Sequence, residues 1–219
     1  MKKVLIALCA AAACALCFAE GGWKNSVGLA LEAPWLNAKI DGNGTKTAFA
    51  PRVSARYFGG FEKGFCVEAK AGAGLAFSED FKLESESGFS KGLAAGASIG
   101  AGYAFGFGKR FSLAALGLVS MDWARFKFKK EIKAPVSSGY ATSEWTQTDD
   151  FIAFGIGAEI LANLRLTEHF SVFASAACEF LDAGFLRREG NNQGRAYDDS
   201  FDVRGKFSVT PSLGAAWVF

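Results

Sequence analysis

Apolar residues alternate with small or polar residues along most of the chain after residue 20. In the clearest segment, 92–108, Leu93, Ile99 and Tyr103 fall on one face, and small residues such as Gly96 and Gly100 fall on the other. A period of two residues is typical of a pleated strand, whereas a helix repeats every 3.6 residues. The same alternation recurs in segments 27–31, 49–57, 65–77, 111–128, 152–166, 170–180 and 203–219, which predicts eight strands and an all-β fold.

One segment departs from the pattern. In 111–128, Leu116 and Leu118 break the parity set by Phe111, Leu113 and Ala115. An extra residue in one strand shifts the faces in this way, so the break predicts a β-bulge there.

The connections between these segments alternate in length. Long polar loops are expected at about 34–48, 78–91, 129–149 and 182–201, and short turns at 59–63, 108–110 and 167–169. Short turns at one end and long loops at the other are typical of an antiparallel up-and-down transmembrane β-barrel. A two-sheet sandwich does not require this asymmetry.

The minority face of the strands carries charges among glycines. A charged side chain at the bilayer midplane costs about 2–4 kcal/mol in a barrel, so this face is expected to point into the lumen and the apolar face toward lipid. A soluble lipocalin-type barrel would need the opposite arrangement. Paired charges that fill the lumen are the favoured interpretation, and a gated polar path is the alternative. The candidate lumen charges are Arg52, Arg56, Glu68, Lys70, Glu159, Arg165 and Glu179, accompanied by Glu32, Arg204 and Lys206.

The first 19 residues have the features of a secretory signal peptide. Lys2 and Lys3 precede a short apolar stretch, and the small residue Ala19 marks the expected cleavage site, which leaves residues 20–219 as one barrel domain. Lipoprotein processing at Cys14 or Cys17 is the alternative. Two cysteines remain in the mature chain, with Cys66 expected to point inward and Cys178 outward, so no disulfide is predicted.

Charge and composition exclude several classes of function. Cleavage would leave 22 basic and 22 acidic residues, which does not favour a nucleic-acid partner. His169 is the only histidine and lies in a short turn, on the side opposite the long loops. We therefore predict no catalytic residue, no metal site and no cofactor.

The last eight residues carry the most specific motif. Ser212, Gly214, Trp217 and Phe219 fit the pattern polar, x, Gly, x, x, hydrophobic, x, aromatic. With a signal peptide and eight alternating segments, this motif resembles the small eight-stranded outer-membrane β-barrel family of bacteria, similar in plan to the OmpX, OmpW and OmpA-barrel proteins. The resemblance implies a location in outer-membrane lipid, insertion by the barrel-assembly machinery through the C-terminal strand, and four extracellular loops.

Aromatic residues in the expected loops suggest an extracellular ligand, or packing of the loops on one another above the barrel mouth. These residues are Trp35, Phe81, Phe89, Tyr140, Trp145, Phe185 and Tyr197. The predicted function is a structural or surface-interaction role. A narrow channel for small or hydrophobic solutes is the alternative, and a lipid-modifying enzyme is a distant third.

Overall fold

The computed structural model describes residues 22–81, 90–108, 110–136, 139–181, 183–192 and 194–219. The expected signal peptide and its cleavage site at Ala19 lie outside these residues. Within them, no helix is long and apolar enough to cross a membrane.

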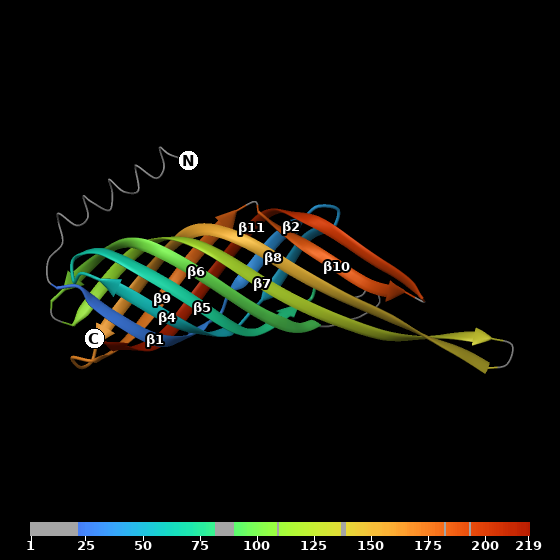
Figure 1. Cartoon of the computed structure of the whole chain (residues 1–219), viewed down its shortest axis with the longest axis horizontal. Coiled ribbons are helices and arrows are strands. Elements are labelled where there is room, and N and C mark those ends of the chain that lie inside the picture. The colour runs from blue at the N-terminus through green and yellow to red at the C-terminus, as the bar shows by residue number, and fades with distance from the viewer. Residues whose placement is uncertain (1–21, 82–89, 109, 137–138, 182, 193) are drawn as a thin grey trace.

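Eight antiparallel strands close into a ring (Figure 1). The ring order is β1 (Lys24–Glu32), β4 (Arg52–Gly60), β5 (Gly64–Ser78), β6 (Ser90–Phe107), β7 (Phe111–Val136), β8 (Gly139–Arg165), β9 (Phe170–Leu181) and β11 (Arg195–Val218). Pairing of β1 with β11 closes the ring, from Ser26 opposite Val218 to Glu32 opposite Ser212. A closed sheet satisfies its backbone hydrogen bonds internally, as a lipid environment requires. The predicted eight-stranded barrel is confirmed.

The two ends of the barrel differ, as predicted. Short turns lie at the end that holds the C-terminus, and β7 and β8 extend far beyond the other end (Figure 1). In the outer-membrane barrels that the sequence resembles, short turns mark the periplasmic end and long connections the extracellular end, and we name the two ends accordingly.

The segments expected to be long loops are in large part strands. The segment 34–48 contains most of the hairpin of β2 (Trp35–Ile40) and β3 (Gly44–Phe49), and β10 (Gly184–Asn192) pairs with both β8 and β11. Strands β7 and β8 remain paired from Phe111 opposite Leu164 to Val136 opposite Gly139. In the described residues, three of the four expected loops are therefore hairpins in large part, and most of the fourth, 82–89, lies outside those residues.

The bulge predicted in 111–128 is wrong. The register of β7 with β6 and β8 runs without a shift, and Leu116 and Leu118 are both buried inside the barrel. An irregularity lies instead in β11, between Val203 and Lys206, where Gly205 has a φ of 119°. Glycine tolerates this positive φ because it has no Cβ.

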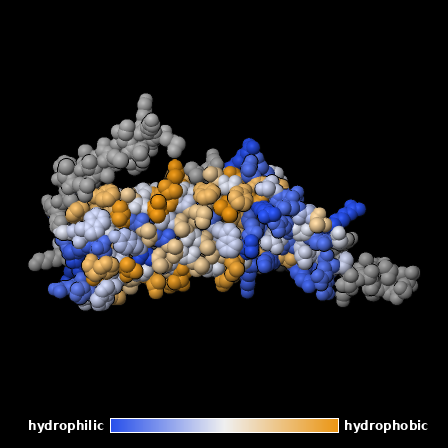
Figure 2. Space-filling view, viewed as in Figure 1, coloured by the Kyte–Doolittle hydropathy of each residue, from blue (hydrophilic) through white to orange (hydrophobic). Residues whose placement is uncertain are grey.

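The outer surface of the barrel carries an apolar belt. Leu29, Leu31 and Ile160 are each more than 60% exposed, and in the view of Figure 2 apolar side chains lie between hydrophilic ends. Aromatic side chains are exposed toward both ends of the belt, as the interfaces of a bilayer favour. Those nearer the periplasmic end are Tyr57, Phe105, Phe107, Phe111, Phe170 and Trp217, and those nearer the extracellular end are Trp35, Phe49, Phe154, Phe180 and Phe207.

Candidate functional site

The middle of the lumen holds a network of buried ion pairs, which we call the lumen network. Its nine side chains come from seven strands of the ring. They are Glu32, Arg52, Arg56, Glu68, Lys70, Asp122, Glu159, Glu179 and Lys206.

One half of the network is centred on Asp122. Its two carboxylate oxygens accept hydrogen bonds from Arg52 Nη1, at 2.8 Å, and from Lys206 Nζ, at 2.5 Å. Arg52 also donates to Glu32, and Lys206 also donates to Glu179, at 3.0 Å. Each cation therefore bridges two carboxylates that lie on different strands.

The other half is centred on Glu159. Lys70 Nζ donates to Glu159 at 2.6 Å, and Arg56 lies between Glu159 and Glu68. Lys70 Nζ also lies 3.8 Å from Glu32, which links the two halves. The pairing satisfies charges that would be expensive to bury alone.

Glycines in the lumen make room for this network. A Cβ placed on Gly96 would lie 1.8 Å from Arg52 Nη1, and one on Gly155 would lie 2.5 Å from the Ser120 hydroxyl. The small residues on the inner face thus accommodate long ionic side chains from the opposite strands.

The structure places six of the seven candidate lumen charges in the network. Arg165 is the exception and lies at the periplasmic end, where its side chain is 25% exposed. Arg204 points outward and pairs with Asp41, because the irregularity in β11 shifts its face. Asp122 was absent from the candidates because the predicted bulge obscured its parity. Without a bulge, its odd separation from Leu113, on the lipid face, places it on the lumen face.

Apolar side chains fill the lumen on the periplasmic side of the network. This lower apolar cluster contains Ala30, Cys66, Ala104, Ala114, Leu116, Leu118, Leu161, Phe173, Ala177 and Ala216, with Phe58 packed against it. The Arg56 guanidinium lies over the Phe173 ring, 4.6 Å from its centroid. As expected, Cys66 is buried, Cys178 is exposed and both are free thiols.

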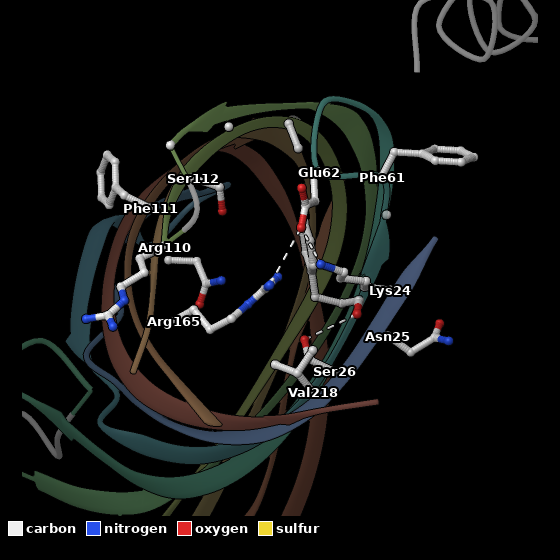
Figure 3. Close-up of a pocket in the computed structure, with 16 residues that line it drawn as sticks. Lys24, Asn25, Ser26, Phe61, Glu62, Arg110, Phe111, Ser112, Arg165 and Val218 are labelled. Carbon is white, nitrogen blue, oxygen red and sulfur yellow. Dashed lines mark hydrogen bonds and ion pairs between the residues drawn. The ribbon is translucent and has the colours of Figure 1, made fainter. Parts of the chain in front are cut away.

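A cavity opens at the periplasmic end of the barrel (Figure 3). Lys24, at the start of β1, donates a hydrogen bond to Glu62 in the turn between β4 and β5. This hydrogen bond lowers the pKa of Glu62 below its ordinary value. Arg165, at the end of β8, points toward the same carboxylate, with Nη1 3.6 Å from Glu62 Oε1.

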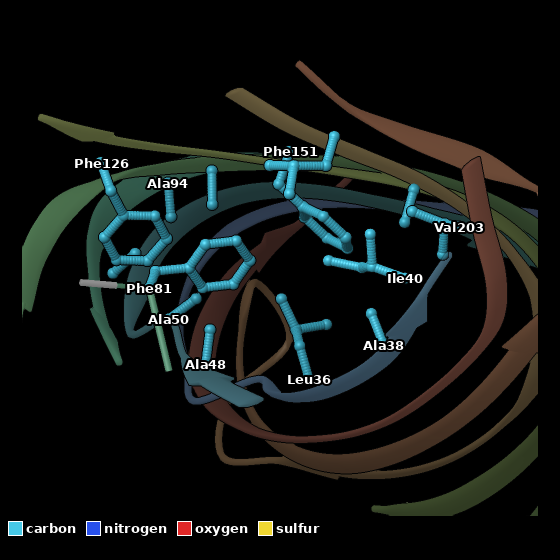
Figure 4. Close-up of a cluster of buried hydrophobic side chains, with 14 of the residues drawn as sticks. Leu36, Ala38, Ile40, Ala48, Ala50, Phe81, Ala94, Phe126, Phe151 and Val203 are labelled. Carbon is cyan, nitrogen blue, oxygen red and sulfur yellow. The ribbon is translucent and has the colours of Figure 1, made fainter. Parts of the chain in front are cut away.

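A second apolar cluster closes the extracellular side of the network (Figure 4). We call it the apolar plug. Leu36 and Ile40 of β2 face Phe81, Phe126 and Phe151 across the lumen. The rings of Phe81 and Phe126 stack, with centroids 4.8 Å apart and planes 7° apart. Phe81 is therefore a core residue rather than an exposed loop residue.

Four strands continue beyond the membrane belt as an extracellular sheet, in the order β7, β8, β10, β11. Its inner side includes Trp145, whose indole donates to the Tyr197 hydroxyl at 3.1 Å. These two loop aromatics pack on each other, whereas Trp35 and Phe185 are exposed. Phe89 and the side chain of Tyr140 lie outside the described residues.

The four residues of the C-terminal motif lie on both faces of β11. Trp217 and Phe219 are more than half exposed toward the lipid side, and Ser212 is buried beside Ser175, with the two hydroxyls 2.6 Å apart. A Cβ on Gly214 would lie 2.4 Å from the Phe173 ring. Gly214 thus has a packing role in the lower apolar cluster.

His169 lies in the short turn before β9, at the periplasmic end. Its ring stacks on Trp217, with centroids 5.3 Å apart, and its Nδ1 lies 3.3 Å from the Val218 carbonyl oxygen. In the described part of the chain, no group of three histidine, cysteine or acidic residues is arranged to hold a metal ion.

Comparisons with known proteins place this fold in a family. A family model described as an outer membrane protein beta-barrel domain matches residues 5–209. The chain belongs to this family, and it is a small β-barrel of the bacterial outer membrane. No curated protein matches the chain by sequence.

The chain is similar to several solved structures of outer-membrane proteins. A major outer membrane protein from Thermus thermophilus is similar over 88% of this chain and 99% of its own, with 14% identity and a TM-score of 0.57. Neisserial surface protein A (NspA) has 15% identity and a TM-score of 0.44, over 90% of this chain and 97% of its own. The attachment invasion locus protein Ail of Yersinia pestis, in complex with the heparin analogue sucrose octasulfate, has 17% identity and a TM-score of 0.40, over 91% of this chain and all of its own.

Proposed function

We propose that this protein is a non-enzymatic surface barrel that binds an extracellular ligand through its extracellular sheet. The observation that carries the proposal is the continuation of β7, β8, β10 and β11 well beyond the apolar belt as a paired sheet. A membrane anchor alone does not need such an extension, whereas a rigid sheet held above the membrane provides a surface for recognition.

The outward cations of β7 favour an anionic polymer as the ligand, and they share the outer face of the sheet with the carboxylates of Glu144, Asp150 and Glu189. Arg125, Lys127 and Lys129 lie on the outer face of β7, and we call them the β7 basic stripe. Arg125 donates two hydrogen bonds to Asp150, and Lys129 pairs with Glu144 at 2.9 Å, where both side chains are more than half exposed. Exposed ion pairs of this kind are weak, so sulfate or phosphate groups of a ligand can compete for the cations.

Binding of heparin, used as a sulfated probe, tests the proposal. Full-length protein in detergent micelles is titrated with heparin at low salt, with wild type compared with the double variant Lys127→Glu/Lys129→Glu. We expect the variant to lose about tenfold or more in affinity and the wild type to weaken steeply with added salt, because contacts with a polyanion release counterions.

A matched control makes the same change of charge elsewhere. Lys39 and Lys63 are exposed cations outside the extracellular sheet, so Lys39→Glu/Lys63→Glu should change affinity by less than about threefold. Equal losses of heparin affinity in the two double variants, or no binding by the wild type, would contradict the proposal that this sheet binds an anionic ligand.

A narrow channel remains the second candidate, carried by the cavity at the periplasmic mouth. The lumen network and the apolar plug lie across its path, so conduction would require them to rearrange. Single-channel recording in planar bilayers tests this candidate. We expect currents at the background level in the wild type and in Glu68→Gln, and steady currents that change in that variant would favour the channel.

We also infer that Trp217 and Phe219 are read by the barrel-assembly machinery. Both side chains are exposed on the lipid face, so removing Phe219 deletes little buried surface. Deletion of Phe219, which also removes its two backbone hydrogen bonds with Asn25, should therefore lower the thermal stability of refolded protein only modestly while strongly reducing the amount inserted in cells. Normal insertion of the truncated protein would refute the role of this motif.

A further inference from the structure

The periplasmic cavity is rich in hydrogen-bond donors and poor in acceptors. The ionisable side chains that point into it are Lys24, Arg165 and Glu62, which carry two positive charges and one negative charge at neutral pH, while Arg110 lies at the rim with its guanidinium pointing away (Figure 3). Ser112 and Asn163, directly opposite each other on β7 and β8, add a hydroxyl and an amide to the same wall. A concave site with this balance favours an anion.

Arg165 supplies the most specific feature of the cavity. Its Nε is buried and has no hydrogen-bond partner. Its nearest carboxylate oxygen, Glu62 Oε1, lies 3.6 Å from Nη1, which is too long for a good hydrogen bond, and Lys24 already donates to that oxygen. A guanidinium has five donors, and buried donors without partners are costly. The side chain as a whole is 25% exposed, so its Nη groups, which hold Glu62 only at 3.6 Å, are the donors that an incoming carboxylate would satisfy.

The inner end of the cavity explains why the anion belongs at Arg165. A smaller cavity deeper in the lumen shares Ser26, Phe58 and Asn163 with the first one and reaches Arg56. Arg56 also has donors without partners, but Glu68 and Glu159 flank it and already compensate its charge. An added anion would meet those two carboxylates, whereas Arg165 has only Glu62, which it shares with Lys24.

The remaining lining selects the type of anion. Phe58, Ala104 and Val218 line the cavity from inside the barrel, so it offers apolar contacts as well as charge, whereas the rings of Phe61 and Phe111 point away from it (Figure 3). Inorganic ions gain nothing from an apolar wall, while an organic acid can bury its carbon skeleton against it.

We propose that the periplasmic mouth is a binding site for an organic carboxylate, with Arg165 as its main anchor. Two sources have this chemistry: a free carboxylic acid in the periplasm, and the terminal carboxylate of a cell-wall peptide. The site is at the opposite end of the barrel from the extracellular sheet, so it is independent of the proposed surface function.

Titration of the mature protein in detergent micelles tests the site. Two probes separate the sources, benzoate for a free acid and D-alanyl-D-alanine for a peptide terminus. The readouts are affinity by calorimetry and the NMR signal of the arginine side-chain Nε–H groups. We expect a saturable shift of one such signal with at least one probe, because a carboxylate that binds the Nη groups of Arg165 changes the electronic environment of the same guanidinium's Nε–H.

Three variants sharpen the test. Arg165→Gln should weaken binding about tenfold or more, and the shifting NMR signal should be absent. Glu62→Gln should tighten binding several-fold, because it removes the carboxylate that competes for Arg165 and leaves Arg165 itself in place. Arg204→Gln removes an arginine whose side chain is exposed in a pair with Asp41, and it should leave binding unchanged.

Several results would overturn the proposal. Absence of a shift with both probes at tens of millimolar would do so, as would equal affinity in the wild type and Arg165→Gln. If Arg165→Gln does not fold, weaker binding by Glu62→Gln, or a tighter affinity for inorganic phosphate than for both carboxylates, would also contradict it.

Discussion

The membrane part and the extracellular part of β7 differ in which side chains they point outward and inward. The membrane part has apolar side chains outside and polar ones inside, and the extracellular part has the reverse. Within the belt, Val119 and Met121 point outward and Asp122 points into the lumen. A few residues further along, Lys127 and Lys129 point outward and Phe126 points inward. The register of the strand is continuous between the two parts, so no change in backbone phase produces this reversal.

The reversal shows that the solvent outside decides what each face carries. Lipid outside the belt requires apolar outward side chains, which leaves the interior to polar groups that must satisfy one another. Water outside the extracellular sheet permits charges there, so the interior can be an ordinary hydrophobic core. Two adjoining segments of one strand therefore take their stability from different sources, ion pairing in the lumen network and apolar burial in the plug.

The largest expected effect tests the ionic part. Lys206→Met leaves Asp122 and Glu179 without their shared cation, and breaking a buried ion pair costs about 3–5 kcal/mol. Urea-induced unfolding in lipid vesicles, followed by tryptophan fluorescence, should show this loss. Lys39→Met, at an exposed site, should change the free energy of unfolding by less than about 0.5 kcal/mol. A loss below about 1 kcal/mol in Lys206→Met would mean that the network contributes little.

The next effect compares the two outer surfaces directly. Ile160→Arg puts a charge on the lipid face of β8 near the middle of the belt and should cost about 2–4 kcal/mol. Thr148→Arg puts the same charge on the outer face of β8 above the belt and should cost less than about 0.5 kcal/mol. The free energies of unfolding in vesicles measure both. Similar costs for the two variants would place the edge of the membrane elsewhere.

A smaller effect tests the interior of the plug against the lipid face. Phe126→Leu leaves a partial void beside Phe81 and should cost about 1–2 kcal/mol. Phe154→Leu removes the same atoms from an exposed position, where lipid chains can fill the space, and should cost less than half as much. Thermal unfolding in detergent provides the comparison, and equal losses would argue against a packed plug.

The smallest expected effect lies in the β7 basic stripe. The hydrogen bond with Glu144 raises the pKa of Lys129 above its ordinary value, which already keeps the side chain protonated at neutral pH. The pair is exposed, and Lys129→Gln should leave the unfolding midpoint unchanged in the same assay. A measurable drop would show that the stripe supports the fold rather than serving only as a surface.

The alternation of apolar and polar residues predicted the barrel and most of its interior, because in a regular strand successive side chains point to opposite faces. Arg52, Glu68 and Glu159 lie in uninterrupted strands, and their parity places them in the lumen. The rule failed at Leu116 and Leu118, because apolar side chains also fill the lumen beside Phe173. The alternation alone cannot show whether an apolar side chain faces lipid or an apolar part of the lumen.

The extracellular hairpins were missed for another reason. Leu36, Ala38 and Ile40 alternate with polar residues, and the following Gly42 and Gly44 both have a positive φ that suits a tight turn. This signal was available, but six-residue strands are easily read as loop. The position of Phe81 against Phe126 depends on contacts between distant segments, which the local sequence does not encode.

The irregularity at Gly205 affects where β11 can tolerate insertions and deletions during evolution. Gain or loss of one residue inside a ring strand exchanges every later side chain between lipid and lumen. The alternation of faces is already interrupted between Val203 and Lys206. Both side chains nevertheless point inward, Val203 into the apolar plug and Lys206 into the lumen network. We expect inherited insertions and deletions to concentrate here and in the turns, and to be purged from the rest of β11.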